Sequence, residues 1–451
     1  MNEQTREILK IGVPAMFEEL ANTLASIIDS QMVSSMGLAA ISAISVTNQP
    51  RLFIMCVFFA VNIVVSVLTA NYLGAEDRDG ANSVLFYGLN ITLIAGVIIS
   101  TICVIFARPI MLLCSGQPDT LNDSILYFRI VIGGLIFNLL YLTINAALRG
   151  CGQTRITMIS NLISCGVNII FNYLLINGNL GFPAMKIAGA ALATVLGNLA
   201  ALFTSLIFAC QKKLYVNFLY MIKSRIRLSR QILSEIYDKW LKAAGENILT
   251  RSGFLAASII TARIGSYDMS IYSIGMHLMN INFALGSGFQ TAAIALVGKS
   301  YGAKNLNEIK SYSRQISKTG LVFALLMSAV MILTSKYYFA LFSDDHNFIK
   351  AGIFVCAIIA VISPIQTCKI ILNGCLRGIG DMSSPLKAAV IGVTIFQPPA
   401  NLILAILLGL GHWGIWIAML LSQLIQLLLL ERNLDKNLKV DSKILYEKLH
   451  E

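Results

Sequence analysis

Charged residues are scarce in this chain. Asp, Glu, Lys and Arg make up only 13% of the 451 residues, whereas 56% are hydrophobic and the mean hydropathy is +0.74. A water-soluble protein of this length has no interior large enough to bury so many apolar side chains. The composition therefore indicates an integral membrane protein.

Motifs for nucleotide, metal and hydrolytic chemistry are also missing. The four histidines show no metal-ligand spacing, and no Walker, Gly-rich dinucleotide or Gly-x-Ser-x-Gly motif occurs. ATP-driven pumping and hydrolysis therefore lose their usual support, and we expect neither enzyme activity nor an organic cofactor. The chain starts without a basic leader and a small-residue cleavage site, so no signal peptide is expected.

Long apolar runs fill the sequence instead. Twelve windows have the roughly 20 residues needed to cross about 30 Å of hydrocarbon. They lack the two-residue alternation of barrel strands, so the predicted fold class is an all-α membrane protein with twelve transmembrane helices. The windows lie near 12–36, 48–72, 84–107, 124–148, 156–177, 187–210, 240–264, 271–298, 316–338, 349–372, 386–409 and 412–430.

A short motif occurs twice at a constant offset. Residues 145–152 (NAALRGCG) return as 373–380 (NGCLRGIG), 228 residues later, and Gly37 maps onto Gly265 at the same offset. One register over most of the length indicates duplication of a six-span half. Because six is even, both Leu-Arg-Gly-x-Gly loops emerge on the same side, which predicts two parallel-repeat six-helix bundles.

The predicted domains follow from this repeat. We expect an N-terminal six-helix lobe over 1–211, a C-terminal six-helix lobe over 240–431 and a cytoplasmic tail over 432–451. The segment 212–239 between the lobes mixes many cations with apolar residues. This pattern favours a cytoplasmic amphipathic linker on the inner leaflet, with a solvated loop as the alternative.

The distribution of Lys and Arg predicts the orientation. With a cytoplasmic N-terminus, 25 of the 34 cations fall in cytoplasmic segments. We expect both termini in the cytoplasm and a multi-pass location in the cell (plasma) membrane, of the prokaryotic inner-membrane type. Anionic lipid at the inner leaflet then explains the net charge of +11, and no nucleic-acid partner is needed.

Ionisable residues inside the apolar windows are the main functional candidates, because a charge near the bilayer centre costs at least about 2.5–3.5 kcal/mol. Asp29 lies in the first window, and Asn22 precedes it by about two helical turns on the same face. A desolvated carboxylate can exchange protons near neutral pH, and with amide oxygens it can coordinate Na⁺. Glu18 and Glu19 lie nearer the cytoplasmic end. Ion coupling is one interpretation of Asp29 and a helix-packing hydrogen bond is the other.

Further polar pairs lie in the fifth and seventh windows. Asn168 and Asn172 lie four residues apart, on one face of the predicted helix. One interpretation places them in the same ion site as Asp29, and the other is that they form hydrogen bonds between helices. Glu246 and Arg251 are candidates in the second lobe, with a structural ion pair as the other interpretation.

The repeated Leu-Arg-Gly-x-Gly loops admit two interpretations. Glycines permit positive φ at a helix end, and the Arg can hydrogen-bond helix carbonyls or a lipid phosphate. We interpret the loops as architecture, with a gate or hinge as the second interpretation. The candidate gate residues are Arg149, Gly150, Gly152, Arg377, Gly378 and Gly380.

Together with the run from Gly189 to Thr194, these motifs resemble the MATE (multidrug and toxic compound extrusion) family over residues 5–430. The resemblance implies two six-helix bundles around a central cavity and export of bulky, often cationic or amphipathic compounds in exchange for Na⁺ or H⁺ by alternating access. It implies a coupling-ion site in the N-terminal lobe, with Na⁺ at Asp29 as one form. The implied polar groups are Asn22, Asn168 and Asn172, with Thr194 in the cavity.

Two departures from the family pattern leave alternatives open. Some relatives have Asp at the position of Asn172, and the tenth window lacks a carboxylate that another branch has. The identity of the coupling ion, Na⁺ or H⁺, and the lobe that binds it therefore stay open. The alternative functions are a flippase or exporter of a lipid-linked saccharide and a non-transporting receptor. We expect small-molecule substrates and a monomer.

Overall fold

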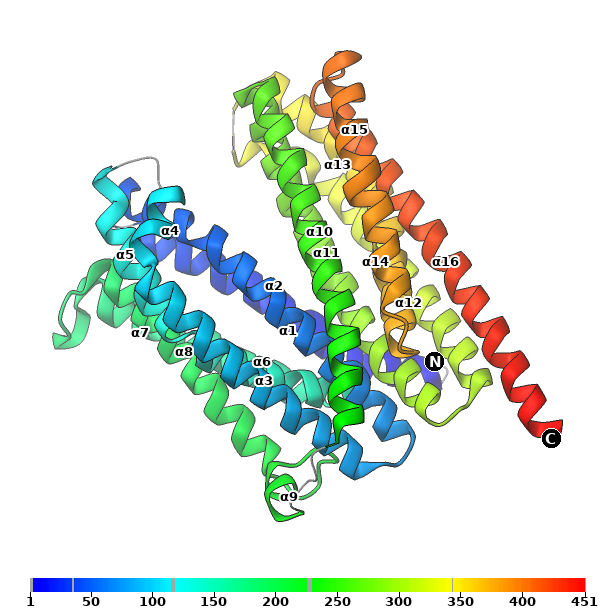
Figure 1. The fold of residues 1–451 in the computed structure, drawn as a ribbon. Helices are drawn as coiled ribbons and strands as arrows, with labels where there is room; N and C mark the ends of the chain where they lie inside the picture. The colour runs from blue at the N-terminus through cyan, green and yellow to red at the C-terminus, as the bar shows by residue number, and fades with distance from the viewer. Residues whose placement is uncertain (1–2, 35, 115–117, 225–228, 343, 451) are drawn as a thin grey trace. The chain divides into compact units, whose positions relative to one another are not determined.

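The computed structural model describes residues 3–34, 36–114, 118–224, 229–342 and 344–450. Within these ranges every regular element is helical, as predicted. Figure 1 shows long helices along most of the chain, with a few short ones such as α4 and α9 between them. The elements are α1 Glu3–Ser34, α2 Leu38–Gly74, α3 Arg78–Ile105, α4 Ala107–Cys114, α5 Pro118–Gly133, α6 Leu135–Gly150, α7 Thr154–Asn177, η1 Asn179–Gly181, α8 Lys186–Ala209, α9 Phe218–Lys223, α10 Arg230–Ile264, α11 Ser266–Gly302, α12 Leu306–Ala340, α13 His346–Gly378, α14 Ser383–Ala389, η2 Val390–Phe396, α15 Gln397–Asn401, η3 Leu402–Leu407 and α16 His412–His450.

The chain packs as two compact units. One comprises Met1–Met16 and Leu241–Glu451, and we call it the C-terminal unit; the other, Phe17–Trp240, is the N-terminal unit. Helices α1 and α10 each contribute residues to both units. The lobe boundaries expected from the repeat stay a prediction.

Most of the predicted spans are separate helices. Among the described residues, nine helices are long and apolar enough to cross a membrane, and α5 with α6, bent by 42°, makes a tenth if the pair is one span. Residues 12–34 of the first predicted window lie in α1, and the window 240–264 lies in α10. These windows contain several ionisable residues, so length and composition alone do not select them. With these two helices the count reaches the predicted twelve.

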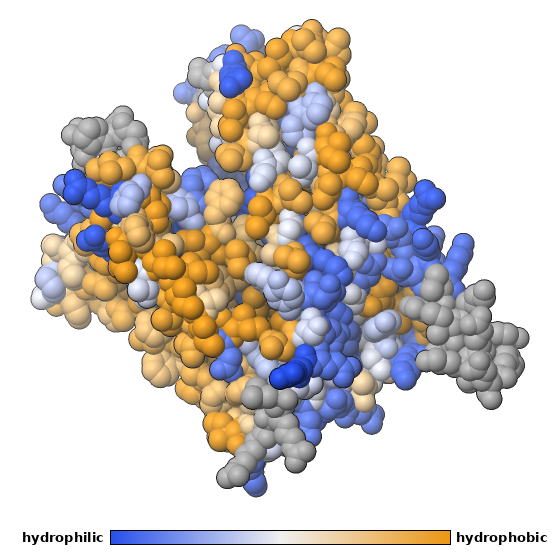
Figure 2. Space-filling model, in the orientation of Figure 1, coloured by the Kyte–Doolittle hydropathy of each residue, from blue (hydrophilic) through white to orange (hydrophobic). Residues whose placement is uncertain are grey.

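The outer surface is suited to lipid. Figure 2 shows broad hydrophobic areas along the helices. On α3, Ile94, Ile98, Ile102 and Ile105 are exposed at three- and four-residue spacing, which places them on one face. Water would disfavour a face of this kind, whereas hydrocarbon solvates it.

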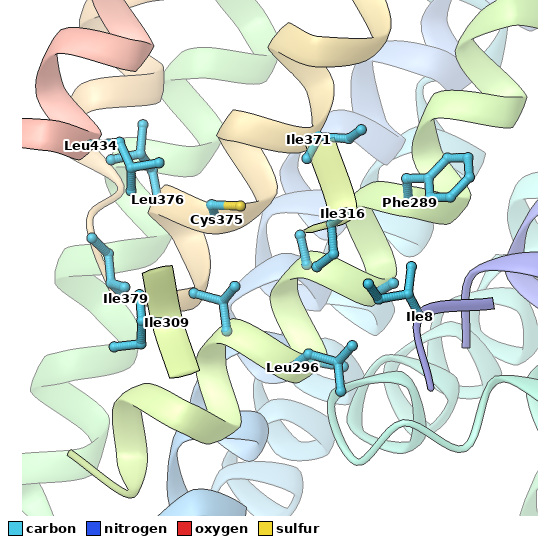
Figure 3. Close-up of a cluster of buried hydrophobic side chains, with 14 of the residues drawn as sticks. Ile8, Phe289, Leu296, Ile309, Ile316, Ile371, Cys375, Leu376, Ile379 and Leu434 are labelled. Atoms are coloured by element: carbon cyan, nitrogen blue, oxygen red, sulfur yellow. The ribbon is translucent and has the colours of Figure 1, made fainter. Parts of the chain in front are cut away.

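The first turns of α1 belong to the core of the C-terminal unit. Figure 3 shows Ile8 beside Phe289 of α11 and Ile316 of α12, and all three side chains are fully buried. Gly12 and Gly288 let α1 and α11 approach closely, because an added Cβ at Gly288 would lie 2.7 Å from the Gly12 carbonyl oxygen. The start of the chain is therefore a packed part of this unit.

The repeated loops close in the same way in both units. Gln153 N donates to Leu148 O at 2.9 Å, and the bond 228 residues later has the same length. Gly152 has φ 73° and Gly380 has φ 84°, a left-handed conformation that favours glycine after a helix end. The second glycine of each motif therefore sets the turn.

The first glycine of each motif has a different role. Gly150 and Gly378 lack positive φ and lie where helices approach closely. An added Cβ would lie 2.3 Å from Ser66 O at Gly150, and 3.0 Å from Gly298 N at Gly378. These glycines serve helix packing, and the gate role of the motif stays a prediction.

The predicted linker over 212–239 is not one continuous helix. It contains the short α9 and, after residues outside the described ranges, the first turns of α10. Arg78 donates hydrogen bonds to Leu214 O at 3.2 Å and Tyr215 O at 3.1 Å, and its guanidinium lies 4.4 Å from the centre of the Tyr220 ring. These contacts fix the turn before α9 against the start of α3. Lipid contact by this segment stays a prediction.

Gly152→Ala and Gly380→Ala should each destabilise the purified protein by about 1–2 kcal/mol, because a Cβ disfavours the left-handed conformation. Thermal unfolding in detergent measures the effect. Gly166→Ala is the control, since its added Cβ meets no atom within 4 Å and it lies within a helix, where alanine is favoured over glycine. Equal melting temperatures for all three variants would contradict this account of the turn.

Candidate functional site

Asp29 and Asn172 meet inside the N-terminal unit. Asn172 Nδ2 donates to Asp29 Oδ1 at 2.5 Å and to Asn168 Oδ1 at 3.3 Å. Asn172 is fully buried and Asp29 is partly buried. The four-residue spacing on α7 puts both amides on the face next to α1. The structure thus brings together Asp29, Asn168 and Asn172, which the sequence identifies as candidates in two separate windows.

Thr194 of α8 joins this group. Asn168 Nδ2 donates to Thr194 Oγ1 at 3.4 Å. Gly197 allows α8 to lie close to α7, since an added Cβ there would be 2.8 Å from Ser164 O and 3.1 Å from Asn168 Cβ. A polar network therefore runs from α1 through α7 to α8.

The network has an oxygen without a protein donor. Asn172 Oδ1 is buried and has no hydrogen-bond partner among the described residues. Leaving a buried acceptor unpaired costs roughly 1–3 kcal/mol, so such an atom points to a ligand. Carboxylate, amide and hydroxyl oxygens form a hard donor set that suits Na⁺, and a protonated carboxyl could donate to the same amide oxygen. The oxygens come from Asp29, Asn168, Asn172 and Thr194.

Asn22 lies in a different group from Asp29. Asn161 Nδ2 donates to Asn22 Oδ1 at 2.9 Å and to Glu18 O at 3.1 Å. Seven residues of helix separate Asn22 and Asp29 by about 10 Å along the axis. The shared face predicted for them is compatible with the helix, but the polar partners of Asn22 lie two turns nearer the start of α7.

Glu18 forms a buried ion pair that the sequence reading did not anticipate. Its Oε1 lies 3.2 Å from Arg149 Nη1, and its Oε2 accepts a hydrogen bond from Thr157 Oγ1 at 2.7 Å. Glu18 is only 4% exposed. The pair ties α1 to the repeated loop at the end of α6.

The C-terminal unit contains the same pair. Arg377 Nη2 lies 2.8 Å from Glu246 Oε1, and both residues are buried. Each member is 228 residues from its counterpart, Glu18 or Arg149. The structure thus pairs Glu246 with Arg377 rather than with Arg251, which is exposed. Applying the repeat offset to the carboxylates would have revealed this symmetry from the sequence.

These pairs indicate a structural role for the arginines of the repeated loops. Each joins the loop to the first long helix of its repeat, and a buried charge that loses its partner is strongly destabilising. Asp29 differs, because the group that donates a hydrogen bond to its carboxylate is the uncharged amide of Asn172.

Comparison with known proteins identifies the architecture. The MatE family model matches residues 14–174 and 243–403, one match in each repeat. The chain belongs to the MatE family. It is therefore a membrane transporter and not an enzyme, and the resemblance found in the sequence is confirmed.

Relatives of this family match nearly the whole chain. The probable multidrug resistance protein NorM of Thermotoga maritima is 24% identical over 420 residues, covering 93% of this chain and 89% of the relative. The uncharacterised transporter YisQ of Bacillus subtilis is 23% identical over 405 residues, covering 90% and 88%.

Solved structures share the fold. A MATE structure in the bent conformation has a TM-score of 0.89 at 19% identity, covering 98% of this chain and 97% of the other. An outward-facing multidrug resistance MATE transporter of the MOP superfamily has the same TM-score, identity and coverage. The predicted all-α architecture of this transporter is confirmed.

Glu246→Gln should destabilise the protein by about 3–5 kcal/mol, because it leaves the Arg377 charge buried without a counter-charge. The double variant Glu246→Gln/Arg377→Met should recover much of that loss. Thermal unfolding in detergent measures both.

Glu18→Gln is the matched comparison for this experiment. The Arg149 side chain is 20% exposed and that of Arg377 is 7% exposed, so water can partly solvate Arg149 and the loss should be smaller. A Glu246→Gln protein as stable as the wild type would refute the structural role of the pair.

Proposed function

We propose that this chain is a secondary active antiporter that exports bulky, often cationic or amphipathic small molecules in exchange for Na⁺ or H⁺ by alternating access. The observation that carries the proposal is the hydrogen bond from Asn172 to Asp29 inside the N-terminal unit. A carboxylate within a membrane span is costly, and such residues mark ion and proton pathways. The hydrogen bond orients the carboxylate without neutralising it.

The coupling ion supplies a positive charge in direct contact with the Asp29 carboxylate, in addition to the attraction of the nearby Arg51. Na⁺ would bind the oxygens of Asp29 and its amide and hydroxyl neighbours, whereas H⁺ would bind the carboxylate itself. Either ion removes the charge that disfavours burial. The ion-bound site is neutral and tolerates burial, whereas the ion-free site is charged and favours contact with water. Ion binding therefore shifts the balance between two conformations, as alternating access requires.

The ion gradient can drive useful accumulation. A membrane potential of 100 mV supplies about 2.3 kcal/mol per elementary charge, which corresponds to roughly fifty-fold accumulation at about 1.4 kcal/mol per decade. For an uncharged substrate, one ion per cycle is therefore enough for export against a substantial gradient. A singly charged cationic substrate exchanged one for one moves no net charge, so its export draws on the concentration gradient of the ion.

The distribution of cations supports cationic or amphipathic substrates. The cations that lie away from the ends of the predicted spans are Arg129, Arg251 and Lys369; the first two are exposed and Lys369 is partly buried. A flippase for a lipid-linked saccharide, the alternative function, would favour a more basic interior to hold its phosphate groups. The multidrug resistance proteins among the relatives support the same choice.

The duplicated halves also disfavour the receptor alternative, because paired repeats suit alternating access. We further propose that both termini lie in the cytoplasm of a prokaryotic inner membrane, in keeping with the positive-inside bias. Anionic lipid would contact the basic cytoplasmic segments of a monomer.

Asp29→Asn should abolish gradient-driven transport while substrate binding without a gradient survives, because the change keeps size and hydrogen bonding but removes the charge. Ethidium or norfloxacin transport by reconstituted vesicles, with Na⁺ and pH gradients imposed separately, measures coupling and identifies the ion. The rate should fall to that of protein-free vesicles.

Asp344→Asn is the matched control, since it neutralises an exposed carboxylate in the C-terminal unit and should leave transport unchanged. Full gradient-driven transport by the Asp29→Asn protein would show that another group carries the ion.

A further inference from the structure

The relation between the repeats extends to the Asp29 region. The offset that relates Glu18 of α1 to Glu246 of α10 also relates Asp29 to Ala257. Ala257 is fully buried. The C-terminal unit therefore has a methyl group where the N-terminal unit has the proposed ion-binding carboxylate.

The amides of α7 also have counterparts, displaced by one residue. The helix that corresponds to α7 contains the π-helical turn Val390–Phe396, and such a turn accommodates one additional residue. Beyond it the offset becomes 229, so Asn168 corresponds to Gln397 and Asn172 to Asn401. Both repeats thus place two amides four residues apart on the same helix.

A close contact between a glycine and the preceding helix in each unit agrees with this change of offset. An added Cβ at Gly189 would lie 2.5 Å from Leu175 O, and an added Cβ at Gly414 would lie 2.5 Å from Leu404 C. Leu175 and Leu404 are 229 residues apart, whereas the two glycines are 225 apart, so the connection before the glycine is four residues shorter in the C-terminal unit.

Ala257 lies at the level of these amides. An added Cβ at Gly245 would meet Leu386 Cδ1 at 3.4 Å, and one at Gly253 would meet Val393 Cγ1 at 2.3 Å. The second contact lies eight residues later than the first in α10 and seven residues later in the segment formed by α14 and η2. The two segments therefore run side by side in the same direction. One further turn of α10 reaches Ala257.

The amide positions contain several buried polar atoms without partners. Gln397 is 1% exposed and Asn401 is 0% exposed. Among the described residues, no hydrogen bond reaches Gln397 Nε2, Asn401 Nδ2, Asn401 Oδ1 or Thr394 Oγ1. Gln397 and Asn401 lie four residues apart on one face of α15, and Thr394 lies in the π-helical turn just before them. Pro398 and Pro399 provide no backbone N–H, so carbonyls one turn before them lack a helical donor.

The unpartnered atoms include both donors and acceptors. A metal cation would satisfy the acceptors only, whereas water donates and accepts and commonly fills buried polar sites. We propose that the C-terminal unit holds an uncharged counterpart of the Asp29 site, lined by Thr394, Gln397 and Asn401, that binds ordered water.

The charge near the proposed water site also disfavours a cation. Gln397 Oε1 accepts from Ser422 Oγ at 3.3 Å, and Gln426 Nε2 donates to that hydroxyl at 3.2 Å. Lys369 Nζ lies 3.5 Å from Gln426 Oε1. The hydrogen-bonded chain from the pocket thus leads to an ammonium group, which would repel Na⁺.

Two measurements test for water. In a dry pocket, Asn401→Leu would remove two unpaired polar atoms and raise the melting temperature. In a hydrated pocket it removes partners of bound water, and we expect the melting temperature in detergent to fall by a few degrees. A rise or no change would overturn the assignment of water.

X-ray hydroxyl-radical labelling of the wild-type protein tests the pocket without substitution. Radicals formed from bound water should oxidise Val393, which is only 2% exposed. Ile359, fully buried in an apolar cluster, is the control and should stay unmodified. An unmodified Val393 would also overturn the assignment.

A transferred carboxylate tests the equivalence of the two sites, and this part rests on the proposed function. ²²Na⁺ binding and proton uptake should be lost in Asp29→Asn and regained in Asp29→Asn/Ala257→Asp/Lys369→Met, which supplies the carboxylate and removes the ammonium group that repels a cation. Undiminished binding by the single variant would refute the proposed function. If ion binding is lost in the single variant and is not regained when the carboxylate is added to the C-terminal unit, the two sites are not counterparts. Neither of these results affects the two measurements that test for bound water.

Discussion

The cost of holding a carboxylate within hydrocarbon governs the use of ionisable groups in this chain. Glu18 and Glu246 each lie against an arginine of their own repeat. Asp29 receives a hydrogen bond from the neutral amide of Asn172, whose oxygen has no protein partner among the described residues. The arginine-paired carboxylates are already neutralised and stabilise the fold. In the proposed function an exchangeable ion neutralises Asp29, so one carboxylate would serve transport while the two arginine-paired carboxylates stabilise the fold.

The two repeats share the same loop geometry and arginine–glutamate pair, but they differ in the polar residues at the Asp29 region. Each uses the same loop, with glycine in the left-handed conformation and an arginine that reaches back to the first long helix. Beyond these shared features the N-terminal unit has Asp29 beside its amides, whereas the C-terminal unit has Ala257 and a π-helical turn. Duplication thus supplied a symmetric scaffold, and local substitutions made the polar sites different.

Much of the fold follows from sequence because hydrocarbon demands long apolar helices and duplication repeats their order. Asp29 and the α7 amides are also detectable, since a polar group is conspicuous in an apolar window. The partner of Glu246 is less accessible, because spacing along one helix reports only neighbours on that helix. Arg251 is near in sequence but exposed, while Arg377 comes from another helix. Similarly, the motif alone does not distinguish Gly150, which allows close packing, from Gly152, which sets the turn.

The most direct test of the central claim is infrared difference spectroscopy of the reconstituted protein while Na⁺ concentration and pH are changed. Carboxyl and carboxylate bands report the state of the ion-binding group itself, without dependence on substrate. The account predicts a carboxyl or carboxylate difference band that responds to the coupling ion in the wild-type protein and disappears in Asp29→Asn. An ion-dependent band that persists unchanged in Asp29→Asn would contradict the account.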